Sequence, residues 1–191
     1  METILDDNRS MTFRMTVTAM FAAVTAVASW ISVPLPFTPV PINLATLAVT
    51  LAGAVLGYKY GTISVLICIL LGAAGVPVFA GFTGGLGHIA GPTGGYIVGY
   101  LTSAFITGIV FRITCKDKIR WYWAAAAAFL GTASCYILGT IWFIVLTGNG
   151  LAASLSMCVI PFIPGDIFKI TASVLIITAL DPVLKRFAVS R

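Results

Sequence analysis

The stretch "WYWAAAAAFLGTASCYILGTIWFIVL", residues 121–146, contains no charged residue. A helix needs about 20 apolar residues to cross the hydrocarbon core of a bilayer, so this stretch is long enough to span a membrane. The whole chain has a similar composition, because 59% of its 191 residues are hydrophobic and only 9% are charged. A soluble domain carries roughly 25% charged residues. The sequence therefore predicts an integral membrane protein.

Six apolar segments separated by turn residues predict an all-α membrane protein of six transmembrane helices in a single domain, residues 1–191. The expected helices cover residues 12–32, 43–57, 61–75, 96–111, 121–146 and 164–180. The second and third segments are short for a bilayer-spanning helix. They either tilt against their neighbours or are extended by the adjoining loops, and the sequence leaves both alternatives open.

The basic residues indicate how the chain is oriented. All but one of the 11 Lys and Arg residues lie at the termini or in the turns after the second and fourth segments. These are Arg9, Arg14, Lys59, Arg112, Lys116, Lys118, Arg120, Lys185, Arg186 and Arg191. The loops after the first, third and fifth segments contain no Lys or Arg. The positive-inside rule then predicts a cell-membrane protein with both termini in the cytoplasm. The net charge of +5 reflects this topology rather than a nucleic-acid site.

The loops on the opposite side of the membrane are rich in proline and glycine. They contain "VPLPFTPVP" (33–41), "GVPVFAGFTGGLGHIAGPTGG" (75–95) and "TGNGLAASLSMCVIPFIPGD" (147–166). Irregular backbone at membrane depth is tolerated only where protein buries it or where it lines a cavity. Glycines allow tight turns, and prolines hold the first loop extended. We therefore expect these loops to cap a ligand pocket that opens to the exterior; the alternative is that they only connect helices.

An acid and a base stand three residues apart in "PFIPGDIFK", residues 161–169. Pro164 and Gly165 favour a helix start, and Asp166 near that start suits the helix dipole. Lys169 opposes the dipole, and a lone lysine inside a membrane costs several kcal/mol. The i, i+3 spacing allows an internal ion pair. We favour a pair that faces the pocket, where Lys169 meets a ligand carboxylate and Asp166 accepts hydrogen bonds.

The sequence gives no support for an enzyme. His88 is the only histidine, and no nucleophile–base or metal-ligating constellation accompanies it, so no catalytic residue, metal or cofactor is expected. The four cysteines form no C-x-x-C pair, which favours buried thiols over disulfides or a metal site. No G-x-x-x-x-G-K-[ST] motif occurs. Because the chain lacks this ATP-binding loop, transport against a gradient would require a partner.

The segment "GVPVFAGFTGGLGHIAGPTGGYIVGY" (75–100), together with "PVPI" (39–42) and "PFIPGDIFK" (161–169), resembles the BioY family. Members of this family are the biotin-specific substrate-binding subunits, or S components, of energy-coupling factor (ECF) transporters. The resemblance extends from about residue 11 to residue 184. It implies a six-helix subunit that binds biotin from outside and docks on a transmembrane coupling protein and two cytoplasmic ATPases. It also implies that Asp166 and Lys169 belong to the biotin pocket.

The chain departs from the family pattern at one place. Members often read "PVPITLQT" where this chain reads "PVPINLAT" at residues 39–46. Ala45 therefore provides no polar contact, although the amide of Asn43 lies close by in the sequence. The substitutions change the expected contact list rather than the expected ligand.

Biotin has a ureido group, an apolar thioether ring and a carboxylate, so its site needs hydrogen-bonding groups, apolar walls and a cation. The expected ligand contacts are Asp166, Lys169, Asn43, Tyr96, Phe79, Gly85 and His88, with Phe37 as a further wall. Phe79 and Phe37 would serve equally well as loop anchors, and a structural loop role competes for His88. The sequence does not fix which end of biotin meets Lys169, and we favour the carboxylate.

Four alanines of the first segment recur at spacings of three and four residues: Ala19, Ala22, Ala23 and Ala26. Small residues at such spacing let helices approach closely in lipid. Packing inside the bundle is one explanation, and the resemblance implies the other, a docking face for the coupling protein.

Two alternative functions share this architecture: an S component for thiamine or riboflavin, and a biotin facilitator that works without ATP.

Overall fold

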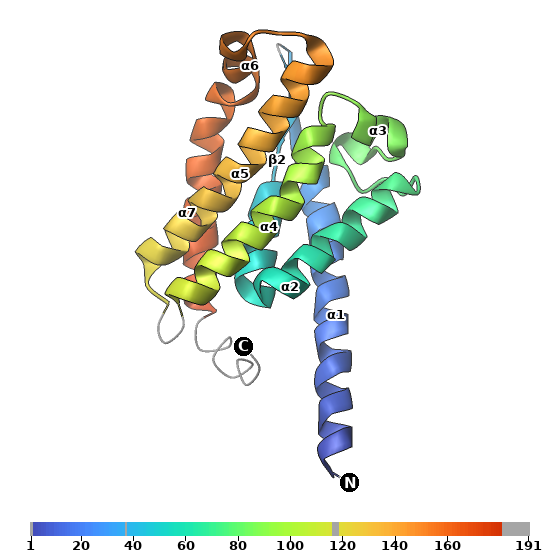
Figure 1. The fold of residues 1–191 in the computed structure, drawn as a ribbon, viewed down its shortest axis with the longest axis vertical. Helices are drawn as coiled ribbons and strands as arrows, with labels where there is room; N and C mark the ends of the chain where they lie inside the picture. The colour runs from blue at the N-terminus through green and yellow to red at the C-terminus, as the bar shows by residue number, and fades with distance from the viewer. Residues whose placement is uncertain (1, 37, 116–118, 181–191) are drawn as a thin grey trace.

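A computed structural model describes residues 2–36, 38–115 and 119–180, with side chains described from residue 11 onward. Apart from loops, this part of the chain consists of helices and one β-ribbon (Figure 1). The α-helices are α1 (Glu2–Trp30), α2 (Ala45–Ala73), α3 (Leu86–Ala90), α4 (Gly94–Thr114), α5 (Trp121–Thr147), α6 (Leu151–Cys158) and α7 (Ile163–Ala179). Two short 3-10 turns are η1 (Ala80–Phe82) and η2 (Ile160–Phe162), and the strands are β1 (Ser32–Leu35) and β2 (Thr38–Asn43).

Five helical stretches of the described chain are long and apolar enough to cross a membrane, as expected for a multi-pass membrane protein. They are Met11–Trp30, Ala45–Ala73, Gly94–Thr114, Trp121–Thr147 and Leu151–Ala179. The last of these stretches contains α6, η2 and α7. The second stretch, α2, contains both the second and the third expected segments, so the five stretches agree with the predicted six-helix membrane fold.

The segments expected at residues 43–57 and 61–75 are not separated by a loop. They form the two halves of α2, which change direction at Gly57, and Figure 1 shows the bend. Gly57 has φ 76° and ψ 175°, a backbone conformation that a residue with a Cβ rarely adopts. A single glycine thus replaces the expected loop.

Glycines bring α2 and α4 into close backbone contact. A Cβ at Gly53 of α2 would lie 2.5 Å from the carbonyl oxygen of Ala104 in α4. In the opposite direction, a Cβ at Gly108 of α4 would lie 2.4 Å from the backbone nitrogen of Tyr58 in α2. Because lipid gives apolar helices little reason to associate, close packing of small residues is the main attraction between them. α4 packs against α5 on its other side, which places it between α2 and α5.

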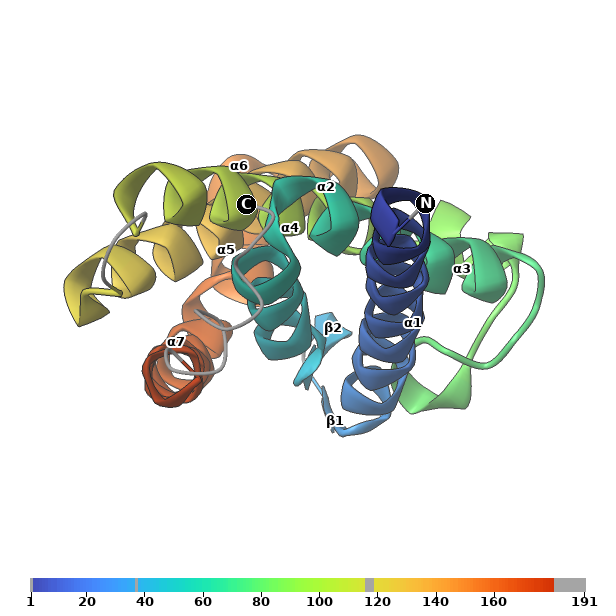
Figure 2. The ribbon, with the colours of Figure 1, turned by 90° about the horizontal axis from the view of Figure 1, so that it is seen from below.

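The three loop regions gather at the end of the bundle opposite to the beginning of α1 (Figure 1). The proline-rich loop is extended, as expected, and its two halves pair as the antiparallel strands β1 and β2. Figure 2 shows this ribbon between α1 and α2. The glycine-rich segment contains η1 and α3, and α6 follows α5. Neither short helix was expected from the sequence.

Candidate functional site

A cavity of about 290 Å³ lies among the loop regions and the helix ends beside them. Residues of α1, both strands, the glycine-rich segment, α2, α4, α5, η2 and α7 line it, and most of its surface is apolar. The volume is close to the lower end of the range for small-molecule sites, roughly 300–1,000 Å³. A cavity of this size suits a compact ligand.

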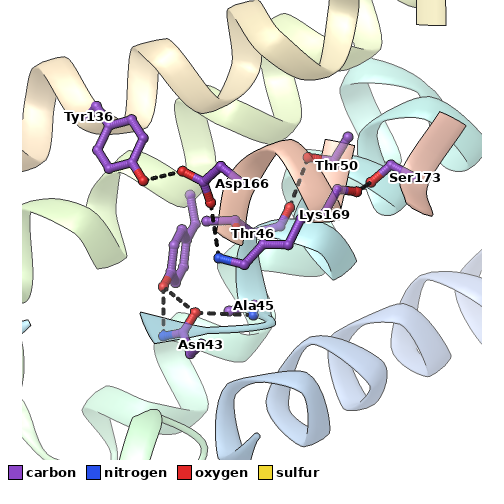
Figure 3. Close-up of polar contacts among 9 residues, drawn as sticks. Asn43, Ala45, Thr46, Thr50, Tyr136, Asp166, Lys169 and Ser173 are labelled. Carbon is purple, nitrogen blue, oxygen red and sulfur yellow. Dashed lines mark hydrogen bonds and ion pairs between the residues drawn. The ribbon is translucent and has the colours of Figure 1, made fainter. Parts of the chain in front are cut away.

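An ion pair forms part of the cavity wall. The Nζ atom of Lys169 lies 3.0 Å from Oδ1 of Asp166, and their side chains are only 8% and 9% exposed. Tyr136 of α5 donates a hydrogen bond to the other carboxylate oxygen, Oδ2 (Figure 3). A lysine ammonium has three N–H donors, and the described residues occupy one of those of Lys169. Lys169 and Asp166 thus form an ion pair with each other and also line the cavity, so the two arrangements that the sequence allowed occur together.

Three helices begin at the cavity. Thr46 in the first turn of α2, Tyr96 in the first turn of α4 and Asp166 near the start of α7 all line it. The N-terminus of a helix carries a partial positive charge and free N–H groups, so it attracts anions. Together with Lys169, these helix ends make the polar part of the cavity suitable for a ligand with a negative charge.

Asn43 lines the cavity, but internal hydrogen bonds use much of its amide. Its Oδ1 accepts a bond from the backbone N–H of Ala45 at 3.1 Å, which fixes the start of α2. Its Nδ2 donates to the hydroxyl of Tyr100 at 3.2 Å. One amide hydrogen thus remains for a ligand. Tyr100 also lines the cavity, and its position four residues after Tyr96 would have indicated the same face of α4.

The expected residues Phe79, His88 and Tyr96 also line the cavity. The rings of Phe79 and His88 stack with their centroids 5.5 Å apart and an interplanar angle of 17°. The Nε2 atom of His88 lies 3.4 Å from the hydroxyl oxygens of both Thr83 and Thr93, so the ring also holds the loop together. Burial lowers the pKa of the His88 imidazole, which favours the neutral ring at pH 7.

Gly85 has a role in the loop rather than in the cavity wall. It precedes α3 with φ 95°, and its N–H donates to the carbonyl oxygen of Gly72 at 2.7 Å. Gly85 is not among the described residues that line the cavity, and its contact with a ligand stays a prediction. Phe37 lies outside the described residues.

The four alanines of α1 do not form one outward face. Ala22 and Ala26 are only 4% and 8% exposed, and they pack in a cluster with Cys68 and Phe79. Ala19 and Ala23 are exposed. Ala22 and Ala26 thus face the bundle, whereas Ala19 and Ala23 face outward. The docking prediction is therefore corrected for Ala22 and Ala26. It continues as a proposal for Ala19 and Ala23 only.

Comparison with known proteins agrees with this arrangement. The model of the BioY family matches residues 3–186. The probable biotin transporter BioY of Pyrococcus horikoshii is 41% identical, with 85% of this chain and 93% of the relative covered. The biotin transporter BioY of Thermotoga maritima is 39% identical, with 82% and 89% covered.

A solved structure has the same fold. The crystal structure of the S component for biotin from an ECF-type ABC transporter matches with a TM-score of 0.84 and 32% identity, over 91% of this chain and 93% of that one. The family match covers nearly the whole chain, and the fold and the relatives agree with it. The chain therefore belongs to the BioY family.

Proposed function

We propose that this chain is the biotin-binding S component of an ECF-type uptake transporter and captures biotin from outside the cell. The observation that carries the proposal is the buried pair of Lys169 and Asp166 in the wall of an otherwise apolar cavity. The names of the BioY relatives and of the matching crystal structure support the choice of biotin as ligand.

In this proposal the carboxylate of biotin binds the free N–H groups of Lys169. The ligand carboxylate then completes the hydrogen bonds of a buried ammonium that already pairs with Asp166. Charge-assisted hydrogen bonds of this kind are stronger than neutral ones. The apolar walls receive the thioether ring, and the remaining amide hydrogen of Asn43 is available to the ureido oxygen. Thiamine carries a positive charge, which Lys169 and the three helix N-termini would repel.

We further propose that the cavity faces the exterior and that both termini are cytoplasmic. The described loops that border the cavity contain no Lys or Arg, whereas Lys59 lies beside the bend of α2 and Arg112 lies near the end of α4. Basic residues concentrate on the cytoplasmic side of membrane proteins. Biotin would then enter between the loop regions at the outer surface.

Energy for uptake comes from partners in this proposal: a transmembrane coupling protein and two cytoplasmic ATPases. The sequence itself contains no P-loop motif. The exposed side of α1 at Ala19 and Ala23 is the proposed docking face, because small side chains allow a partner helix to approach closely.

Ligand selectivity is the first prediction. Isothermal titration of the purified protein with biotin should give a Kd of about 1 µM or lower, which is more than 8 kcal/mol of binding free energy. Thiamine and riboflavin should give no saturable heat at the same concentrations. Tight binding of either vitamin without binding of biotin would refute the choice of ligand.

The second prediction concerns Lys169. Removing one partner of a buried, hydrogen-bonded charge pair costs about 2 kcal/mol or more, so Lys169→Ala should weaken biotin binding by roughly 30-fold or more. Biotin methyl ester, which lacks the negative charge, should lose much less affinity. The matched control is Ser173→Ala. The Ser173 hydroxyl donates to the backbone carbonyl of Lys169, so this variant leaves the Lys169 ammonium in place and should not affect binding. Equal losses for biotin and its ester would argue against pairing with the carboxylate.

The third prediction concerns the docking face. Ala19→Leu combined with Ala23→Leu should reduce co-purification with the coupling protein and its ATPases, because larger side chains keep a partner helix away. Biotin binding should stay unchanged. Ala152→Leu on α6, which is also exposed, is the control and should leave the complex intact. If the double variant assembles as well as the wild type, this part of α1 is not the docking face.

A further inference from the structure

Tyr136 lines the cavity and also bonds to the ion pair in its wall. It lies near the middle of α5, whereas Asp166 and Lys169 lie one turn apart on α7. Its hydroxyl donates to Oδ2 of Asp166, and Lys169 donates to Oδ1 at 3.0 Å. Figure 3 shows the two donors on separate oxygens of one carboxylate. The described residues thus supply one donor to each oxygen, and the two donors come from different helices.

The position of the Tyr136 ring is fixed by two other aromatic rings. Tyr96, in the first turn of α4, meets it edge to face with centroids 6.3 Å apart. Phe162, in η2, lies beside it at a tilt of 33° with centroids 6.5 Å apart. Both neighbours are buried. The packing of α4, α5 and η2 therefore holds the hydroxyl at the carboxylate before any ligand binds.

The Tyr136 hydroxyl limits how much of the Lys169 ammonium Asp166 can take. An ammonium has three N–H donors, and both oxygens of a carboxylate accept hydrogen bonds. A buried carboxylate oxygen without a donor is unfavourable, and a charged donor satisfies it best. If Oδ2 were free, it would draw a second N–H of Lys169, because the ammonium already lies against the same carboxylate. Since the hydroxyl occupies Oδ2, Lys169 makes a single contact with Asp166.

We propose that Tyr136 is a positioning residue that keeps the ammonium of Lys169 available to the ligand carboxylate. The tyrosine acts through Asp166, because it binds the carboxylate oxygen that would otherwise take a second N–H of Lys169. This inference rests on the proposed function, in which Lys169 binds the carboxylate of biotin. It makes the affinity for biotin depend on α5, although both charged residues lie on α7.

A role in packing alone is the alternative, because the ring contacts Tyr96 and Phe162. The substitution Tyr136→Phe separates the two roles, since it keeps the ring and removes only the hydroxyl. A packing role predicts unchanged binding of biotin by this variant. The positioning role predicts weaker binding.

Isothermal titration of Tyr136→Phe with biotin and with biotin methyl ester tests the proposal. Biotin should bind about 10-fold more weakly than to the wild type, because it loses one hydrogen bond from a charged donor. The ester has no carboxylate to make that bond, so its affinity should fall much less. The matched control is Tyr100→Phe, which removes another cavity-lining hydroxyl, one that accepts a bond from Asn43. Any loss in this control should be the same for biotin and its ester.

The outcomes separate the role of Tyr136 from the proposed function. If the wild type does not bind biotin, or if Lys169→Ala weakens biotin and its ester equally, the proposed binding of the carboxylate by Lys169 fails. If Lys169→Ala is selective for biotin but Tyr136→Phe binds like the wild type, the role of Tyr136 alone is refuted. Equal losses of biotin and ester in Tyr136→Phe would refute that role in the same way.

A structure of Tyr136→Phe without ligand provides a second measurement. The Nζ atom of Lys169 should then lie within hydrogen-bond distance, about 3.2 Å, of both carboxylate oxygens of Asp166. This result would show directly that the hydroxyl keeps the ammonium from a second contact. An Nζ atom that still contacts Oδ1 alone would overturn the proposal.

Discussion

The buried pair of Lys169 and Asp166 is the constraint on which the site depends. Two charges inside a membrane protein are expensive, and each would be unfavourable without the other. Their i, i+3 spacing on α7 supplies the 3.0 Å contact, and Tyr136 from α5 satisfies the second carboxylate oxygen. The position of α5 relative to α7 is therefore part of the site. Among the described residues the ammonium of Lys169 has Asp166 as its one partner, and a ligand carboxylate is suited to accept its remaining hydrogen bonds.

The surrounding fold creates a cavity at this pair. Close contacts at Gly53 and Gly108 join α2 to α4, and residues at the starts of α2, α4 and α7 line the same cavity. The β-ribbon and the glycine-rich segment close the cavity toward the end of the bundle. Irregular backbone is acceptable at this depth because it lines a cavity rather than facing lipid. The loops thus line the cavity rather than only connecting helices, as their composition predicted.

Features that depend on local sequence could be predicted, and those that depend on packing could not. A charge-free stretch such as residues 121–146 identifies a membrane helix without reference to other segments, and the spacing of Asp166 and Lys169 predicts their pairing. Tyr136 was missed because it lies inside that same apolar stretch, and only the packing of α5 against α7 brings it to the carboxylate. The sequence left open whether Ala22 faces the bundle or a partner, since alanine spacing does not tell which side of a helix faces the bundle. At Gly57, the sequence did not show that one residue would suffice for the turn.

A structure of the protein with biotin bound would test the central claim most directly. The account predicts that biotin occupies the 290 Å³ cavity with a carboxylate oxygen at about 2.7–2.9 Å from the Nζ atom of Lys169, the distance of a charge-assisted hydrogen bond. The contact between Lys169 and Asp166 should persist in that structure. Biotin bound outside the cavity, or bound inside it with the carboxylate away from Lys169, would contradict the account.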